Sequence, residues 1–167
     1  MQDLDNNYQG AASVAVGHGA GYSCQGSDSV AIGVMAGKCC QGSYSVAMGN
    51  RAGRNCQQTN AVAIGSEAGY NTQGQYAVAI GSGAGYGCSC NQGQYSVAIG
   101  AYAGGGSAHE YSIILNSSGT TLNAANAGFY VSATRYEETQ EDIDGIAFYN
   151  PTTKEMRYSY TLDGGSF

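Results

Sequence analysis

A five-residue block that returns every sixteen residues dominates the sequence. It begins at Ser13, Ser29, Ser45, Ala61, Ala77, Ser96 and, in a degenerate form, Ser112. The single longer step, from Ala77 to Ser96, contains a three-residue insertion around Cys88–Asn91. One unit therefore reads S-V-A-I-G-x-x-A-G-x-x-x-Q-G-x-x. A fixed period constrains the architecture strongly, because a short unit that cannot bury its own apolar side must stack on its neighbours.

Each unit contains a short run with the alternation of a β-strand. Val30 and Ile32 point to one side of such a strand and Ala31 points to the other, and the following glycine ends it. We expect a second extended piece around Ala36–Gly37 and a second turn at Gln41–Gly42. Two strands and two turns make one coil of a β-solenoid. Stacking then predicts one column of Val14, Val30, Val46, Val62, Val78 and Val97, and another of Val16, Ile32, Met48, Ile64, Ile80 and Ile99.

The predicted fold class is all-β, a β-solenoid of about six 16-residue coils. Ordering the sixteen residues of one coil costs more conformational entropy than the small apolar area buried within that coil offsets. This imbalance favours a parallel homotrimer, in which more surface is buried. We expect valine, isoleucine and alanine to be buried in each coil, with the Ala31-type and Ala36–Gly37-type positions close to a neighbouring chain. The alternative is a monomeric solenoid closed by caps at its ends.

The sequence divides into three parts. They are an N-terminal lead-in at 1–12, the solenoid repeats at 13–116 and a C-terminal capping or attachment module at 117–167. The period fails after Asn116, and Phe129–Val131 is predicted to form a strand. The segments Gly145–Tyr149 and Glu155–Tyr160 flank a turn around Asn-Pro and predict a β-hairpin that caps the solenoid or attaches it to another protein.

Composition excludes several classes of protein. Glycine occupies 27 positions and proline one, without the every-third-residue spacing of collagen. Three acids balance three bases between Ser13 and Tyr111, so the net charge of -6 lies outside the repeats and no basic face for nucleic acid is expected. There is no long apolar run and no signal-like start, so we expect synthesis in the host cytoplasm and no membrane insertion.

The repeat unit S-V-A-I-G-x-x-A-G resembles the head repeats of trimeric autotransporter adhesins. The segments SIILNSSGTTLNAANAGFYV and FYNPTTKEMRYS are more similar to fibre-type proteins of phages and of large DNA viruses of algae and protists. The resemblance covers residues 11–160. It implies a left-handed β-roll with three parallel chains around a common axis. The coil is longer than the usual adhesin coil, and these residues show no coiled-coil stalk or membrane anchor, which favours the viral relatives.

Cysteines recur at one phase of the repeat. Cys24, Cys40, Cys56 and Cys88 share that phase, and Cys39 and Cys90 are additional. Stacking predicts a column of thiols along one edge, in which disulfides such as Cys24 with Cys39 or Cys40 are geometrically feasible. The alternative is that the cysteines are free packing or edge residues. A metal site is not expected, because no cluster with zinc-type spacing is present.

Tyrosines recur at two further phases and predict aromatic ladders. One ladder contains Tyr22, Tyr70 and Tyr86, and the other contains Tyr44, Tyr76, Tyr95 and Tyr111. Such ladders are candidates for contact with host-surface glycans, whose apolar faces stack on aromatic rings. The alternative is that the rings pack across coils and shield the turns.

The repeats carry no recognisable catalytic constellation. His18 and His109 lie far apart, and no nucleophile elbow, metalloprotease motif or phosphate loop is present, so we expect no catalytic residue and no cofactor. Asp142 and Asp144 could serve as glycosidase carboxylates, but they lie in an acidic run that is more typical of an exposed loop.

These features predict a non-enzymatic structural fibre or spike at the virion surface. Its partners would be its own copies, other virion proteins and a host-surface glycan or receptor, bound multivalently. The alternatives are a carbohydrate-active tail spike and a bacterial cell-surface adhesin head. An ice-binding solenoid would need regularly spaced threonines, which are scarce in the repeats.

Overall fold

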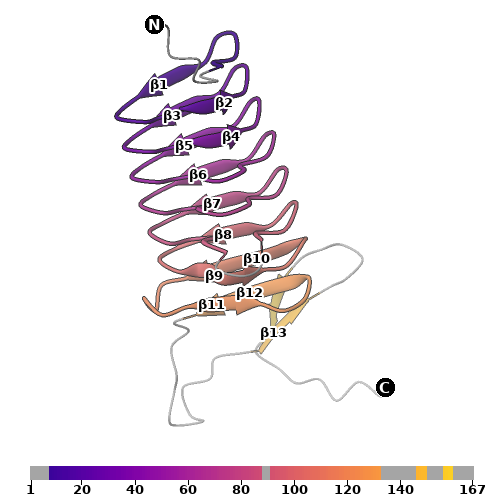
Figure 1. The fold of residues 1–167 in the computed structure, drawn as a ribbon. Coiled ribbons are helices and arrows are strands. Elements are labelled where there is room, and N and C mark those ends of the chain that lie inside the picture. The colour runs from indigo at the N-terminus through magenta and orange to yellow at the C-terminus, as the bar shows by residue number, and fades with distance from the viewer. Residues whose placement is uncertain (1–7, 88–90, 133–145, 150–155, 160–167) are drawn as a thin grey trace, which may run out of the picture. The chain divides into compact units, whose positions relative to one another are not determined.

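The chain forms a stack of parallel strands, shown in Figure 1. The computed structural model describes residues 8–87, 91–132, 146–149 and 156–159, and these contain no helix. No helix in the described ranges therefore has the length and hydropathy of a membrane span. The chain divides into two compact units, Met1–Ala133 and Thr134–Phe167. The first unit is a β-solenoid, which confirms the predicted fold class.

One long parallel sheet runs the length of the first unit. Neighbouring strands pair in register, so that Val14 lies opposite Val30 and Val30 lies opposite Val46. The register places each residue beside its equivalent in the next unit, which confirms the predicted columns. The strands in spatial order are β1 (Val14–Val16), β3 (Val30–Ile32), β5 (Val46–Met48), β6 (Val62–Ile64), β7 (Val78–Ile80), β8 (Val97–Ile99), β10 (Ser112–Asn116) and β12 (Gly128–Ser132).

The opposite side of the coil has shorter pairings. β2 (Ser23–Gln25) pairs with β4 (Cys39–Gln41), single bridges such as Gln57 to Gln73 continue the column, and β9 (Ala103–Ala108) pairs with β11 (Leu122–Ala124). The second strand was therefore predicted too early in the unit. Ala36–Gly37 lies in a turn instead, where Gly37 has a φ of 54°.

The core of the solenoid consists of alanine, which corrects the predicted orientation of the strands. Ala31, Ala47 and their equivalents in the following coils have no exposed surface, Ala15 in the first coil is partly buried, and Ala36, Ala52 and Ala68 face them from the other side of the coil. Valine and isoleucine point outward, and Ile64 is 37% exposed. The alanine positions are thus used inside one chain and do not approach a neighbour.

Coil width explains this orientation. A sixteen-residue coil brings its two sides close together, and alanine on both sides fills the space without forcing them apart. The serine that begins each block is also inside, and Ser29 Oγ donates a hydrogen bond of 2.6 Å to the carbonyl of Gly26. The alternation of the strand then leaves the larger side chains on the outer face.

A column of buried glutamines completes the core. Gln25, Gln41, Gln57, Gln73 and Gln92 are each at most 2% exposed. Each Nε2 donates to the carbonyl of the valine that starts the strand of the same coil, as in Gln57 to Val46 at 2.8 Å. The glutamine thus ties the two sides of a coil together. The prediction of a turn at Gln41 was wrong, because Gln41 is the last residue of β4 and only Gly42 leads into the turn.

Glycine is required where the glutamine amide meets the opposite turn. A Cβ on Gly53 would lie 2.7 Å from Oε1 of Gln57, and Gly53 has a left-handed φ of 54°. The Cα hydrogen in that direction points at the amide oxygen, in the geometry of a weak C–H···O contact. The A-G pair of the repeat is therefore a packing requirement of the glutamine.

The solenoid continues beyond the predicted limit at residue 116. β12 pairs with β10 over five residues, and Gly128 lies opposite Ser112, so the sixteen-residue step persists after the S-V-A-I-G motif is lost. The core also changes composition here. Ala108 replaces the glutamine, and Ile114 replaces the alanine and is fully buried. The larger isoleucine offsets the smaller alanine, so the volume of the coil is nearly kept.

The second unit contains β13 (Ile146–Tyr149) and β14 (Met156–Ser159). The two strands pair antiparallel, with Tyr149 opposite Met156. These are the segments expected to form the arms of a hairpin. The predicted turn between them and the acidic run with Asp142 and Asp144 lie outside the described residues, and the capping role stays a prediction.

Replacement of one core glutamine tests the role of this column. In the Gln57→Ala variant, the Val46 carbonyl loses its donor and a cavity forms, so the free energy of unfolding should fall by about 2–4 kcal/mol. The exposed neighbour Gln58 offers a matched control, because Gln58→Ala makes the same chemical change outside the core. Urea denaturation of both variants measures the difference. Equal free energies of unfolding for the two variants would show that the buried amide does not stabilise the coil.

Candidate functional site: surface columns of the solenoid

An uninterrupted apolar surface covers the outer side of the long sheet. We call it the apolar face. Some members are well exposed, such as Val16 at 56% and Leu115 at 37%, and others, such as Val62, are half-buried. Monomeric proteins seldom expose so continuous an apolar patch, and a patch of this kind marks an interaction site. The face consists of Val14, Val30, Val46, Val62, Val78, Val97, Ile113 and Phe129 in one column and Val16, Ile32, Met48, Ile64, Ile80, Ile99, Leu115 and Val131 in the other.

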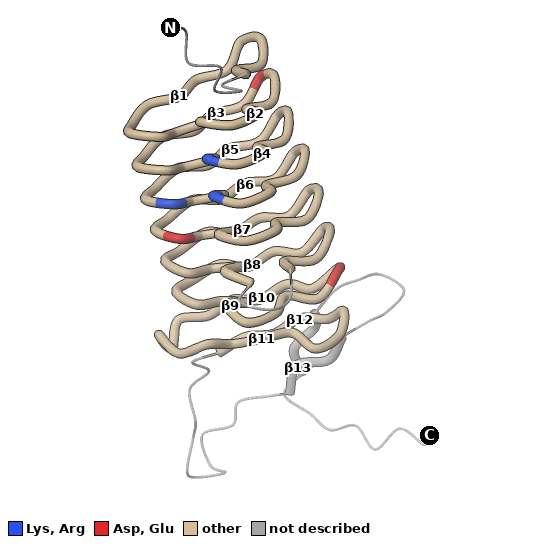
Figure 2. The backbone as a smooth tube through the Cα atoms, in the orientation of Figure 1, with Lys and Arg blue, Asp and Glu red and all other residues tan. Residues whose placement is uncertain are grey.

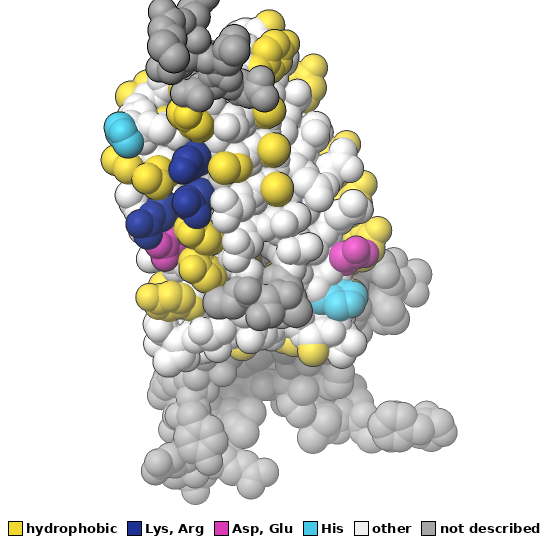
Figure 3. Space-filling model, viewed as in Figure 1, with side chains coloured by type: hydrophobic (Ala, Val, Ile, Leu, Met, Phe, Trp, Pro, Cys, Tyr) yellow, Lys and Arg dark blue, Asp and Glu magenta, His cyan; other side chains and the backbone are white. Residues whose placement is uncertain are grey.

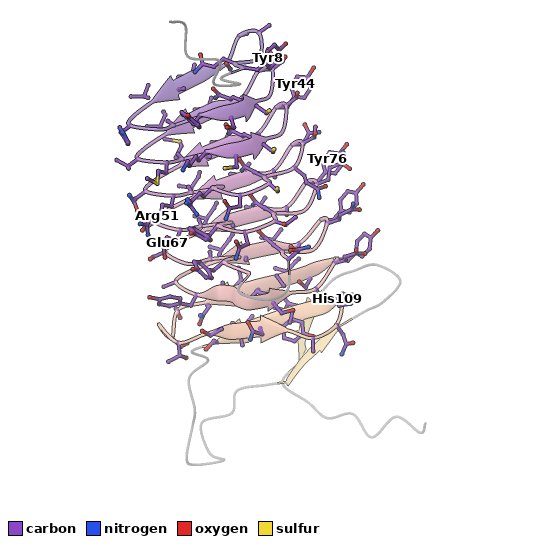
Figure 4. All side chains as sticks on the ribbon, in the orientation of Figure 1. Tyr8, Tyr44, Arg51, Glu67, Tyr76 and His109 are labelled. Atoms are coloured by element: carbon purple, nitrogen blue, oxygen red, sulfur yellow. The ribbon has the colours of Figure 1, made fainter. Side chains whose placement is uncertain are left out.

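A stack of three tyrosines occupies one corner of the coil. The ring centroids of Tyr76 and Tyr95 are 5.0 Å apart and those of Tyr95 and Tyr111 are 5.4 Å apart, with nearly parallel planes. Tyr44 belongs to the same column but is separated from the stack by Asn60. Figure 4 shows Tyr44 and Tyr76 pointing outward at the same edge of the solenoid.

The other tyrosine column also contains basic residues. Its members in order are Tyr22, Lys38, Arg54, Tyr70 and Tyr86. Tyr70 and Tyr86 stack at 4.9 Å, and the Arg54 guanidinium lies 5.3 Å from the Tyr70 ring and donates to its hydroxyl at 2.7 Å. Cation–π and ring contacts thus link consecutive coils.

Stacking limits what the tyrosines can bind. Glycans contact aromatic residues through the ring face, but in a stack each inner ring has both faces covered by its neighbours. Tyr95 is in this position and presents only its edge and hydroxyl to solvent. The geometry thus favours packing across coils for the stacked rings, and glycan contact along the ladders stays a prediction.

Three cysteines form the predicted column of thiols. Cys24, Cys40 and Cys56 are exposed, lie on consecutive coils and share a left-handed backbone with φ between 51° and 55°. We call these three residues the thiol column. Cys39 is half-buried in the adjacent column, where its in-register neighbours are Ser23 and Asn55. All four are free thiols, and Cys88 and Cys90 lie outside the described residues.

The pKa of Cys40 is raised above its usual value. Partial desolvation of this largely exposed side chain is the main cause, and the neighbouring Cys56, Cys24 and Cys39 raise the pKa further. Near neutral pH, Cys40 is therefore a thiol. Within the described part of the chain, no group of three or more histidine, cysteine or acidic side chains is arranged to hold a metal ion.

The basic residues of the described repeats lie on one flank, and two acidic residues lie at the opposite edge (Figure 2). Lys38, Arg51 and Arg54 lie on neighbouring coils, as Figures 2 and 3 show. Arg51 donates to Glu67 at 3.0 Å on the next coil, at the edge opposite the tyrosine stack in Figure 4. Because this ion pair is exposed, it contributes little to stability.

A shallow hollow of about 330 Å³ lies near that ion pair. Tyr86 and Tyr102 form its aromatic walls, and glycines including Gly83 line it. The Tyr102 ring lies against Gly83, where a Cβ would approach it to 2.8 Å. Glu67, Ser82 and Thr121 add carboxylate and hydroxyl groups. Rings beside hydroxyl and carboxylate groups are suited to a small polar ligand with an apolar face, such as a sugar.

Sequence reasoning did not identify this hollow, because its walls come from several coils. Tyr102 does not share the phase of the other tyrosines, although it shares a phase with Arg51 and Glu67, and all three have a left-handed backbone. A search for large side chains in every phase of the repeat would have found it. His18 and His109 belong to different coils, and the Nδ1 of His109 lies 2.9 Å from the carbonyl oxygen of Glu110.

Removal of the central ring of the stack tests its contribution to stability. Tyr95→Ala removes two ring contacts and should lower the free energy of unfolding by about 1–3 kcal/mol. Tyr44→Ala is the control, because Tyr44 has the same backbone conformation and lies between Asp28 and Asn60 in its column. The comparison is made by urea denaturation. A loss of the same size in both variants would show that the stacking adds nothing.

The chain has no match among the known proteins with which it was compared: no protein-family model, curated protein or solved structure matches it.

Proposed function

We propose that this chain is a structural protein that assembles with copies of itself into a rod-like fibre or spike. The observation that carries this proposal is the apolar face. Every side chain in its two columns is apolar along eight strands, while the core of the coil contains little but alanine, serine and glutamine. The largest apolar side chains of the repeats thus lie where only another molecule can cover them.

A second copy of the chain is the partner that fits this face best. Its columns have the same spacing along the stack, so parallel copies match row by row over the whole length. Three chains around a common axis would let the valine column of one chain meet the isoleucine column of the next. The likeness to the head repeats of trimeric adhesins supports this arrangement.

The functional setting that we propose is the surface of a virion. The likeness of the C-terminal segments to fibre-type proteins of phages and large DNA viruses supports it. The protein would act mechanically, with other virion proteins as its attachment point. In a trimer, each surface column would be presented three times, so that weak contacts with a host surface add up.

A host-surface glycan is the second partner that we propose, and the hollow between Tyr86 and Tyr102 is the site that favours it. One face of a sugar ring could rest on an aromatic wall while its hydroxyls donate to Glu67. This site does not use the inner rings of the tyrosine stack, whose faces are covered. It concerns binding without catalysis.

Self-association is tested by the native molar mass of the full chain. Light scattering after size-exclusion chromatography should give about three times the chain mass of 17.1 kDa, with and without reductant. Ile64→Lys places a charge in the centre of the apolar face and should give single chains, because burial of an unpaired charge is costly. Gln58→Lys adds the same charge at an exposed position outside that face and should leave the mass unchanged.

Two outcomes would contradict this prediction. A single chain mass for the unsubstituted protein would overturn self-association and leave a monomeric solenoid. An equal loss of assembly in both lysine variants would show that added charge, rather than the apolar face, determines the result. Circular dichroism confirms that each variant keeps its β-structure.

Glycan binding is tested on an array of neutral oligosaccharides. Tyr102→Ala removes one wall of the hollow and should reduce the signal of any bound glycan at least tenfold, whereas Tyr44→Ala should retain it. If the binding of a glycan is lost in Tyr44→Ala and retained in Tyr102→Ala, the contact lies on the tyrosine ladder. Release of reducing sugars from a bound polysaccharide would instead support a carbohydrate-active spike.

A further inference from the structure

The thiol column brings reactive side chains into direct register. β2 pairs with β4 in parallel, with Ser23 opposite Cys39 and Gln25 opposite Gln41, so Cys24 lies beside Cys40. The following bridge from Cys39 to Asn55 sets Cys40 beside Cys56 in the same way. Cys24 and Cys56, one coil away on either side, both raise the pKa of Cys40.

This spacing is compatible with a disulfide between coils. Paired parallel strands lie about 4.8 Å apart, which falls within the range of Cα separations that a disulfide spans, about 4.4–6.8 Å. The three cysteines share one backbone conformation, so their Cβ atoms are also separated by about the coil spacing, somewhat more than the typical 3.8 Å. Closure requires a small inward movement, and such a strained, exposed disulfide is readily reduced again.

We propose that the thiol column is a redox modification site, in which oxidation by a peroxide joins Cys40 to either Cys24 or Cys56 through a reversible disulfide. The two thiols lose two protons and two electrons and form one S–S bond. One molecule of hydrogen peroxide accepts them and leaves as two molecules of water. The bond closes a loop between consecutive coils and restrains their separation.

The number of thiols in the column makes Cys40 the central partner. Cys24 and Cys56 lie two coils apart, so within the thiol column each lies beside Cys40 and not beside the other. A single disulfide in the column therefore leaves one exposed thiol at an end of the column. That thiol can attack the disulfide, so that the bond moves from one pair of cysteines to the other. Cys39 lies beside Ser23 and Asn55 and has no in-register thiol partner in its own column.

This site is independent of the proposed assembly. The thiol column belongs to the β2–β4 side of the coil, whereas the apolar face belongs to the long sheet. Oxidation therefore does not require self-association, and failure of either proposal leaves the other intact.

The pairing is tested by peptide mapping after treatment with hydrogen peroxide and alkylation of the remaining thiols. Trypsin cleaves after Lys38, Arg51 and Arg54, so Cys24, Cys40 and Cys56 lie in three different peptides. The Cys39→Ser variant leaves Cys40 as the only thiol of the middle peptide. In this variant, the middle peptide should be linked to the peptide of Cys24 or to that of Cys56, and dithiothreitol should release it. Because Cys88 and Cys90 lie in the same tryptic peptide as Cys56, fragmentation of the linked peptides must place the bond on Cys56.

Cys40→Ser provides the matched control. It should abolish links to the middle peptide even though Cys39 is present, and the oxidised unsubstituted protein should have a higher Tm than this variant by a few degrees. The linked species must migrate as a single chain on a denaturing gel without reductant. Full alkylation of Cys40 after peroxide treatment, or links found only between two chains, would overturn the proposal.

Discussion

The narrow interior of the coil is the constraint on which the rest of the structure depends. The two facing sides of a coil leave room only for small side chains such as Ala31 and Ala36. The side-chain amide of Gln41 fills the remaining space and donates a hydrogen bond across the coil to the Val30 carbonyl. Because side chains alternate along a strand, small residues inside dictate that the neighbouring large residues are outside. The apolar face is therefore a direct consequence of the alanine core. A solenoid of this width cannot bury its own valines inside the coil.

Part of this architecture follows from the sequence. The period predicts the stacked strands, their register and the columns of cysteine and tyrosine. It does not determine which side of the strand faces inward, because alternation fits either orientation and the choice depends on the width of the coil. Gln41 was taken for a turn residue because it is polar and precedes glycine. Its recurrence at the same position of five successive units, as Gln25, Gln41, Gln57, Gln73 and Gln92, was the signal that it belongs to the core.

The end of the solenoid shows a different limit of sequence reasoning. The motif disappears after Ile114, yet Gly128 follows Ser112 by the same step and pairs with it. The sixteen-residue spacing is set by the path of the backbone, whereas the motif reflects the side chains that fill the interior of the coil. In this part of the solenoid, Ile114 and Ala108 fill the interior in place of alanine and glutamine. The hollow beside Tyr102 was missed for a related reason. It is made by residues of several coils, and a linear reading of one unit does not bring them together.

The regular register of the long sheet has a consequence for how such a protein changes its size. Each unit pairs only with the unit before and the unit after, and each adds the same cross-section. A duplication or deletion of sixteen codons would therefore lengthen or shorten the stack by one rung of about 4.8 Å. Neither the interior nor the outer columns would need to be redesigned. The length of the stack can thus change by whole coils while its cross-section and its surface columns stay the same.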